Sequence, residues 1–295
     1  MKQGPVFIKA IPRSGGTLFT TLLDAHTEIA MSYEIYEENL FGEGGIPLKV
    51  EKTLNWLENE MPDMNDDLQW IKQLPDNNLR VFLYRARRGG LEMAEIMDIL
   101  KSIEDKDTAF ETSTGRLSFI EALMQKKAQK QGKTIWGGKT QADLYELHDR
   151  HPDACFFIMN RDVRDMFSSM QNRGSFTYTA RQAAELWRER ILEFRRFAAR
   201  RNPKAMEIDY EDLARDPGTV LTEACRLIGT KYDPGMLGFH NQNMTLFKNP
   251  HGHLSNEQLK QGLNTSSIGR WKTDLSAEDA DAIMAIAGDF IYERT

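Results

Sequence analysis

A short turn near the start of the chain carries residues that could bind a phosphate or sulfate group. Residues 12–17 read Pro-Arg-Ser-Gly-Gly-Thr and follow an apolar run. Gly15 and Gly16 allow the backbone to curl so that several N–H groups point into one concavity. Arg13 adds a forked cation, and a helix starting after the turn adds the partial positive charge of its N-terminus. Further donors are the hydroxyls of Ser14 and Thr17.

This turn differs from other well-known phosphate-binding loops. A Walker A loop ends in Gly-Lys-Ser/Thr, which brings a lysine to the terminal phosphates and a hydroxyl to Mg²⁺. Here the cation, Arg13, precedes the glycines and that ending is absent, which disfavours a metal-dependent NTPase. The turn has no cysteine, so it is not the loop of a Cys-based phosphatase. The alternative is an ordinary tight strand–helix turn with Arg13 in solvent.

A second basic segment follows another apolar run in the middle of the chain. Arg161 comes directly after residues 154–159, and Ser169 lies eight residues later (169 − 161), about two helical turns away. Asp162 is positioned to cap the helix that begins there. This segment predicts a second anion-binding turn at a strand end. Arg164 and Asp165 are expected to form only a solvated face of that helix.

The composition limits which class of protein this is. The chain has 295 residues and a formal net charge of −6, which argues against a non-specific nucleic-acid binder. Cys155 and Cys225, the only cysteines, occur in apolar patterns and are expected to be buried rather than paired or metal-bound. The first apolar run, residues 5–11, is too short for a signal peptide or a membrane span. We therefore expect a cytoplasmic protein.

Strand and helix patterns alternate along the chain, which predicts an α/β fold with a parallel sheet. Ligands of such sheets bind at the carboxyl ends of the strands, where both turns fall. The expected strands are residues 5–11, 29–32, 134–136, 154–159 and 205–208. The expected helices are residues 17–26, 117–131, 141–150, 163–170, 180–201, 220–228 and 277–292. Residues 42–115 are expected to be more irregular than the rest, with helical pieces at 48–60 and 91–104.

These motifs together resemble the PAPS-dependent sulfotransferase family (PAPS is 3′-phosphoadenosine-5′-phosphosulfate), in particular its tyrosylprotein and Golgi-type branch and bacterial relatives. The resemblance implies a P-loop NTPase-like three-layer α/β/α fold, with one domain over residues 1–295 and residues 42–115 as an acceptor-side insertion. It implies PAPS as donor, adenosine 3′,5′-bisphosphate as product, and no required metal. Gly16 stands where the family more often has Thr or Ser.

The resemblance also assigns residues to the nucleotide. It implies that the first turn binds the 5′-phosphosulfate, through Arg13, Ser14, Gly15, Gly16, Thr17 and Leu18. Arg161 and Ser169 match an Arg and a Ser that bind the 3′-phosphate. Tyr210, in Tyr-Glu-Asp-Leu, is similar to a nucleotide-contacting Tyr, although a Tyr at a strand end is usually packing. Arg270 and Trp271 resemble a late basic-Trp element that closes over the nucleotide; the alternative is a surface loop anchored by its Trp.

Three residues match catalytic positions of the family. Glu34 falls where the branch places its general base, although the acidic residues after it would also suit a plain acidic loop. Lys139, in Trp-Gly-Gly-Lys-Thr, is similar to a Lys that stabilises charge on the transferring group, and a solvated Lys in a glycine turn is the alternative. Ser255 matches a nucleotide-contacting Ser only with a one-residue gap. Tyr36 replaces an Arg that binds acidic peptides, which argues against tyrosylprotein specificity.

The acceptor is open at this level: a small molecule, a carbohydrate or a peptide that offers a hydroxyl or an amine. Nucleic acid and membrane partners are not expected, and the chain could act as a monomer or a homodimer. Arg85, Arg87 and Arg88 are expected to lie in a solvated loop, with a patch for an anionic acceptor as the alternative. Two other functions stay open: a P-loop nucleotide kinase or NTPase, and a non-catalytic nucleotide-binding protein.

Overall fold

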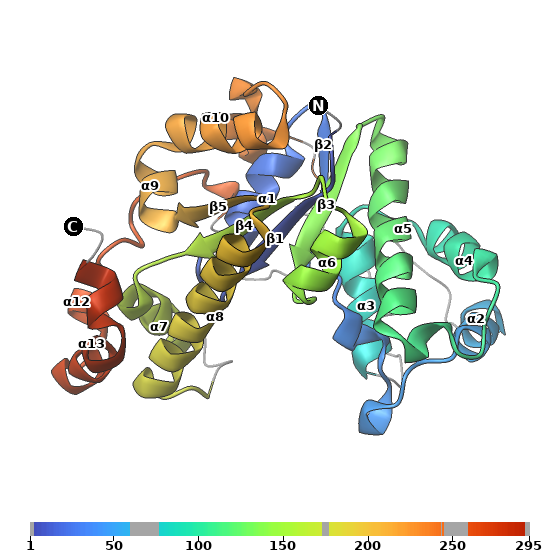
Figure 1. Ribbon diagram of the computed structural model, residues 1–295, viewed down its shortest axis with the longest axis horizontal. Coiled ribbons are helices and arrows are strands. Elements are labelled where there is room, and N and C mark those ends of the chain that lie inside the picture. Colours follow the sequence, from blue (N-terminus) through green and yellow to red (C-terminus); the bar gives the residue numbers. More distant parts are fainter. Residues whose placement is uncertain (1–2, 60–76, 173–176, 243, 245–258, 293–295) are drawn as a thin grey trace. The chain divides into compact units, whose positions relative to one another are not determined.

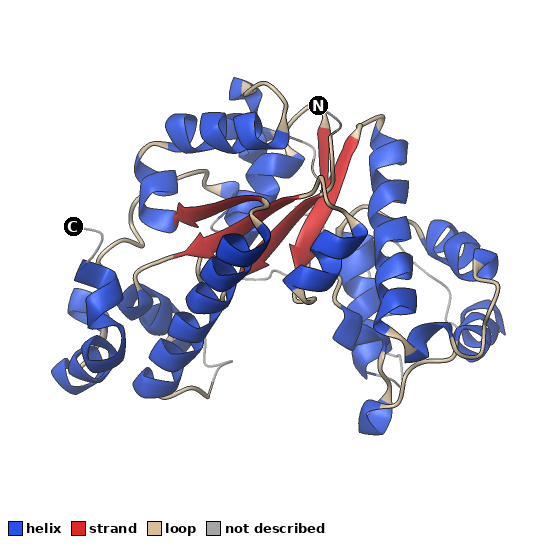
Figure 2. Cartoon of the chain, in the orientation of Figure 1, coloured by secondary structure: helices blue, strands red, loops and turns tan. Residues whose placement is uncertain are grey.

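The computed structural model describes residues 3–59, 77–172, 177–242, 244 and 259–292 (Figure 1). Within these residues a five-stranded sheet has the strand order β2-β3-β1-β4-β5. The pairings of β1 with β4, β4 with β5, and β2 with β3 are parallel. Helices join the strands (Figure 2). The prediction of an α/β fold with a parallel sheet is confirmed. The strands are β1 (Val6–Ala10), β2 (Ile29–Ser32), β3 (Ile135–Thr140), β4 (Cys155–Asn160) and β5 (Lys204–Asp209).

The chain forms two compact units, and each is described by itself. Unit 1 comprises residues 1–19, 143–237 and 261–295, and unit 2 comprises residues 20–142 and 238–260. Helix α1 (Gly16–Asp24) begins in unit 1 and ends in unit 2. A single domain over the whole chain, with residues 42–115 as its insertion, stays a prediction.

Unit 1 is built around β1, β4 and β5. Every residue of β1 and β4 is buried, as the unbroken apolar run before Asn160 predicts for a parallel strand covered on both faces. Cys155 and Cys225 are both fully buried, and burial raises the pKa of each thiol to about 11, so both act as small apolar side chains. The helices of this unit are α6 (Leu144–Arg150), α7 (Val163–Gln171), α8 (Ala180–Arg201), α9 (Tyr210–Arg215), α10 (Pro217–Ile228), α12 (Trp271–Asp274) and α13 (Ala277–Tyr292).

The helix ends of unit 1 follow the capping residues that the sequence provides. The side chain of Asp162 accepts a hydrogen bond from the backbone N–H of Arg164 and so caps α7, as predicted. Gly229 ends α10 in the left-handed conformation, with φ of 91°. Helix α13 packs against α8 and α7, with the rings of Trp187 and Phe290 edge to face.

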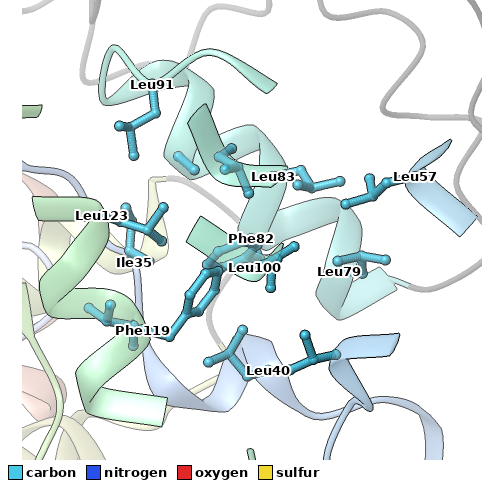
Figure 3. Close-up of a cluster of buried hydrophobic side chains, with 14 of the residues drawn as sticks. Ile35, Leu40, Leu57, Leu79, Phe82, Leu83, Leu91, Leu100, Phe119 and Leu123 are labelled. Atoms are coloured by element: carbon cyan, nitrogen blue, oxygen red, sulfur yellow. The ribbon is translucent and has the colours of Figure 1, made fainter. Parts of the chain in front are cut away.

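Unit 2 joins β2 and β3 to a helical layer. Helix α5 packs against both strands, and a cluster of buried apolar side chains fills the space between α5 and the preceding helices (Figure 3). Phe119 of α5 contacts Phe82 and Phe110 within that cluster. The helices are α2 (Val50–Asn59), α3 (Asn77–Arg88), α4 (Met93–Ser102) and α5 (Ser113–Gln131), with short 3₁₀ helices η1 (Glu37–Leu40), η2 (Glu43–Gly45) and η4 (Ala109–Glu111); a further 3₁₀ helix, η5 (Pro234–Asn241), crosses from unit 1 into unit 2.

A buried ion pair ties the elements of unit 2 together. The ammonium of Lys127, on α5, lies 2.9 Å from both carboxylate oxygens of Asp24 at the end of α1. The same carboxylate accepts hydrogen bonds from the Met31 N–H and the Tyr33 hydroxyl. Lys127 is only 1% exposed, so this pair is desolvated and fully hydrogen-bonded. It fixes the strand that leads into Glu34.

Two sequence predictions in unit 2 are wrong. Strand β3 does not stop at Trp136 but continues to Thr140, because Gly138 lets Met124 of α5 approach: a Cβ there would lie 2.7 Å from the Met124 Cε. The three arginines predicted to lie in a loop instead form the last turn of α3. Helical pieces at 48–60 and 91–104 are confirmed as α2 and α4.

Candidate functional site

The turn after β1 curls through two residues in the left-handed region of backbone conformation. Arg13 and Gly15 both have positive φ, 69° and 93°. Gly15 is also required for space, because a Cβ at this position would lie 2.6 Å from the Tyr210 ring. The Ser14 hydroxyl and N–H both donate to the Ile11 carbonyl, so this side chain holds the turn itself.

The helix that follows the turn starts where the sequence analysis placed it, give or take one residue. Gly16 is the first residue of α1, so its N–H belongs to the helix N-terminus. Thr17 and Leu18 occupy half-buried positions in the first turn of that helix. Together with Arg13, this arrangement offers an anion the helix dipole, backbone N–H groups and a guanidinium.

The turns after β1 and β4 are directly linked. The Arg13 Nε donates to the Ser169 hydroxyl oxygen over 2.9 Å, and the Arg161 guanidinium donates to the Arg13 carbonyl over 3.1 Å. Residues 156 positions apart in the sequence therefore share one hydrogen-bonded cluster. The structure thus brings together Arg13, Arg161 and Ser169, which the sequence analysis had singled out separately.

Arg161 is the most buried of these groups, at 6% exposure. A second donor of its guanidinium reaches the Ser267 carbonyl over 2.6 Å. Its guanidinium carbon lies 4.5 Å from the centre of the Tyr210 ring, a cation–π contact. The buried Nε of Arg161 has no hydrogen-bond partner among the described residues. The Tyr210 ring is therefore held between Gly15 and Arg161.

The Asp165 carboxylate on α7 holds the segment before α12 in place. Asp165 is not on a solvated face but 1% exposed. Its two oxygens accept the backbone N–H groups of Gly269 and Trp271, over 2.7 and 2.9 Å. These two N–H donors satisfy the hydrogen-bonding capacity of a carboxylate that is removed from water. Asp165 therefore acts as a clasp that fixes the loop carrying Arg270 and Trp271.

Arg270 and Trp271 lie at the start of α12. The guanidinium of Arg270 donates to Asp274, which also accepts the Ser168 hydroxyl over 2.7 Å. Hydrogen bonding by Ser168 is the main cause that lowers the pKa of Asp274 to about 2. The Trp271 ring lies 4.0 Å from the Arg164 guanidinium carbon, so Arg164 packs on this loop as well as pairing with its own helix cap.

In unit 2, Glu34 and Lys139 form a short ion pair. The Lys139 ammonium lies 2.6 Å from a Glu34 carboxylate oxygen. Lys139 is within β3 and 8% exposed, so the alternative of a solvated lysine in a turn is wrong. Glu34 follows β2 with a positive φ of 55°, a conformation unusual for a residue with a side chain.

Electrostatics keep this pair charged. The Lys139 ammonium is the main cause that holds the pKa of Glu34 far below its usual range, against the opposing effect of burial. Burial is the largest influence on Lys139 and lowers its pKa, but Glu34 and Tyr36 more than offset it, so the net shift is upward. Glu34 is therefore an ionised carboxylate at neutral pH, held in a defined position.

Two arginines of α3 extend this charged group. The Arg85 guanidinium lies 5.0 Å from the centre of the Tyr36 ring and donates to the Asn39 side-chain oxygen over 2.9 Å. Arg88 is 3% exposed. Both arginines contribute to the lowered pKa of Glu34. The sequence around these arginines carries no signal that connects them with Glu34.

Ser255 lies outside the described residues. Within residues 3–59, 77–172, 177–242, 244 and 259–292, no three His, Cys, Asp or Glu side chains gather in a group that could hold a metal ion. In the same part of the chain, none of the helices combines the length and apolar character that crossing a membrane requires.

Comparisons with known proteins identify the fold and the family of this chain. The sulfotransferase domain from the curacin biosynthetic pathway has a similar fold, with a TM-score of 0.54 and 15% identity, over 96% of this chain and 97% of that one. The sulfotransferase domain from the Synechococcus PCC 7002 olefin synthase gives a TM-score of 0.53 and 18% identity, over 99% and 96%. Curated protein sequences give no match. The model of the sulfotransferase family matches residues 5–234, so this chain belongs to the sulfotransferase family.

Proposed function

We propose that this protein transfers a sulfuryl group from PAPS to a hydroxyl or an amine of an acceptor, which is a small molecule, a carbohydrate or a peptide. The observation that carries the proposal is the hydrogen-bonded cluster of Arg13, Arg161 and Ser169 at the carboxyl ends of β1 and β4. A nucleotide phosphorylated at both its 3′ and 5′ ends needs two anion-binding turns close together, and these two turns share hydrogen bonds.

The residues of unit 1 fit such a donor. The buried Nε of Arg161, without a partner among the described residues, is a donor that an anionic oxygen would satisfy. Arg161 and Ser169 would bind the 3′-phosphate, and Arg13 with the N-terminus of α1 would bind the 5′-phosphosulfate. Tyr210 and Trp271 would pack beside the nucleotide, and Arg270 would reach a phosphate by leaving Asp274. PAPS, when bound, supplies the sulfuryl group and a stable leaving group.

Glu34 is proposed to take the proton of the acceptor. The acceptor oxygen or nitrogen forms the new bond to sulfur as the bond from sulfur to the bridging oxygen breaks. Adenosine 3′,5′-bisphosphate leaves with that electron pair, and the Glu34 carboxylate receives the proton. A positioned base of this kind contributes about 10²–10⁴ in rate.

The ion pair with Lys139 controls when Glu34 can accept a proton. A carboxylate with a strongly lowered pKa binds a proton weakly, so the ion pair of Glu34 with Lys139 must loosen before the proton is taken. The released ammonium would then stabilise negative charge that develops on the transferring group. In this proposal Lys139 restrains the base until a donor is present, and no metal is needed.

The test is transfer itself. The protein is incubated with sulfur-labelled PAPS and a metabolite extract, and labelled products are identified by mass. Calorimetry with adenosine 3′,5′-bisphosphate is run in parallel. Labelled products together with bisphosphate binding support the proposal. Bisphosphate binding without any product would indicate a non-catalytic nucleotide-binding protein, and Mg²⁺-dependent ATP turnover without PAPS binding would indicate a kinase or NTPase.

A further inference from the structure

The last turn of α3 presents its three arginines in two directions. Arg87 donates to the Leu91 carbonyl and pairs with Glu92, so it holds the segment that joins α3 to α4. Arg85 and Arg88 are three residues apart and therefore lie on one face of the helix. Both act on the pKa of Glu34, and Arg88 also acts on that of Lys139. The helix face that carries Arg85 and Arg88 is thus the one whose charges influence the proposed base, Glu34.

Among the described residues, neutral groups hold Arg85. Its guanidinium stacks on the Tyr36 ring at 5.0 Å and donates to the Asn39 amide oxygen over 2.9 Å. Asn39 is itself fixed, because its oxygen also accepts the Tyr36 N–H. Within the described part of the chain, no Asp or Glu forms an ion pair with Arg85. Two supports therefore hold this guanidinium in one orientation without neutralising its charge.

Arg85 adds a positive charge to the surroundings of the ion pair between Glu34 and Lys139. Among the described residues, Lys139 balances the charge of Glu34 within that pair, whereas Arg85 has no carboxylate partner of its own. Arg85 is half-buried, so its charge is partly desolvated. Uncompensated charge in such surroundings is costly, and an incoming anion would relieve the cost.

We propose that the acceptor carries an oxyanion, a carboxylate or a phosphate, in addition to the group that receives the sulfuryl, and that Arg85 binds this oxyanion. The inference rests on the proposed function. Arg85 is the suitable cation because it is half-buried, whereas Arg88 is almost fully buried. A held guanidinium offers two parallel donors that match the geometry of a carboxylate or a phosphate. Arg85 is thereby a residue that determines acceptor specificity.

An alternative is that the arginines only keep Glu34 ionised, or that they bind PAPS rather than the acceptor. Pairs of acceptors in which only one member carries an oxyanion separate these roles. We would compare 4-hydroxyphenylacetate, 3-hydroxybutyrate and glucuronate with their carboxamides, and glycerol 3-phosphate with glycerol. Each is assayed with labelled PAPS, and the acceptor found in the metabolite extract is added to the set. The variants are Arg85→Gln and Arg85→Lys, with Arg87→Gln as the matched control from the same helical turn.

The wild-type protein should prefer the anionic member of each pair that it accepts. Arg85→Gln should reduce the ratio of kcat/KM between anionic and neutral members by about ten- to a hundred-fold, the worth of a hydrogen bond between charged groups. Arg85→Lys should keep part of the preference, and Arg87→Gln all of it. All variants should bind adenosine 3′,5′-bisphosphate as the wild type does.

Three results would overturn the proposal. They are a wild-type preference for neutral members, an Arg85→Gln variant that keeps the preference, and an extract acceptor that is neutral or cationic. If the bisphosphate binds but neither the pairs nor the extract yields a product, the proposed transferase function itself fails, and this inference falls with it.

Discussion

The Nε of Arg13 donates to the hydroxyl oxygen of Ser169 over 2.9 Å, although the two residues are 156 positions apart in the sequence. The contact joins the turn after β1 to the second helical turn of α7. It means that the two turns lie side by side. The account of this protein as a sulfotransferase with a doubly phosphorylated nucleotide depends on this junction.

Substitution of either arginine should remove most of the nucleotide affinity. We expect Arg13→Ala and Arg161→Ala each to weaken binding of adenosine 3′,5′-bisphosphate by about ten- to a thousand-fold, because each removes charged hydrogen bonds to a phosphate. Isothermal titration calorimetry measures this directly. Arg226→Ala is the matched control, since Arg226 is exposed and its ion pair among the described residues is with its helix neighbour Glu223. Equal affinity in all three variants would refute the assignment of the two turns.

Glu34→Gln should separate binding from chemistry. The amide is nearly isosteric but cannot accept the acceptor's proton, so we expect kcat to fall by about 10²–10⁴ while bisphosphate affinity stays unchanged. Single-turnover transfer from labelled PAPS gives the rate, and calorimetry gives the affinity. Transfer at the wild-type rate would show that Glu34 is not the base.

The ion pair of Glu34 and Lys139 predicts a pH-dependent stability. The folded pKa of Glu34 lies below its unfolded value, mainly because of the Lys139 ammonium. Its stabilising contribution is therefore complete at pH values above 4.5, the usual pKa of this side chain, and is lost as the pH falls toward the folded pKa. At pH 7, Glu34→Gln should lower the free energy of unfolding by on the order of 3 kcal/mol, because Lys139 is left buried and unpaired.

Urea denaturation between pH 7 and pH 3 tests this. The gap between the wild type and Glu34→Gln should be constant near neutrality and should narrow below about pH 4.5. A gap that is the same at every pH would mean that the pair is not ionised as the structure indicates.

The clasp formed by Asp165 should control the loop before α12. In Asp165→Asn, one of the two acceptors becomes an NH₂ group, so either Gly269 or Trp271 loses its partner. We expect faster hydrogen exchange at these two amides and a bisphosphate affinity about ten-fold lower, a typical worth for a hydrogen bond to a charged group. Asp279→Asn, on α13, serves as control. Unchanged exchange at residues 269 and 271 would rule out the clasp.

Much of the arrangement around Arg13 and Arg161 could be predicted from local sequence. The turn around Arg13 and the spacing from Arg161 to Ser169 are signals within short segments, and each sits after an apolar run that proved to be a buried strand. Parallel strands place their carboxyl ends together, so the meeting of the two turns followed from the predicted fold.

The remaining contacts depend on partners distant in the chain. Asp165 looked like a surface residue, because its partners Gly269 and Trp271 are 104 and 106 positions away. The end of β3 was misplaced because Gly137 and Gly138 suggested a turn, whereas Gly138 is needed for the approach of Met124. The position of Arg85 over Tyr36 likewise required the packing of α3, which no short motif encodes.

A crystal structure with adenosine 3′,5′-bisphosphate bound tests the central claim most directly. The account predicts the 3′-phosphate within hydrogen-bonding distance of Arg161 and Ser169, and the 5′-phosphate in the turn of Arg13 at the start of α1. A nucleotide bound elsewhere, or with only one phosphate in contact with these turns, would contradict it.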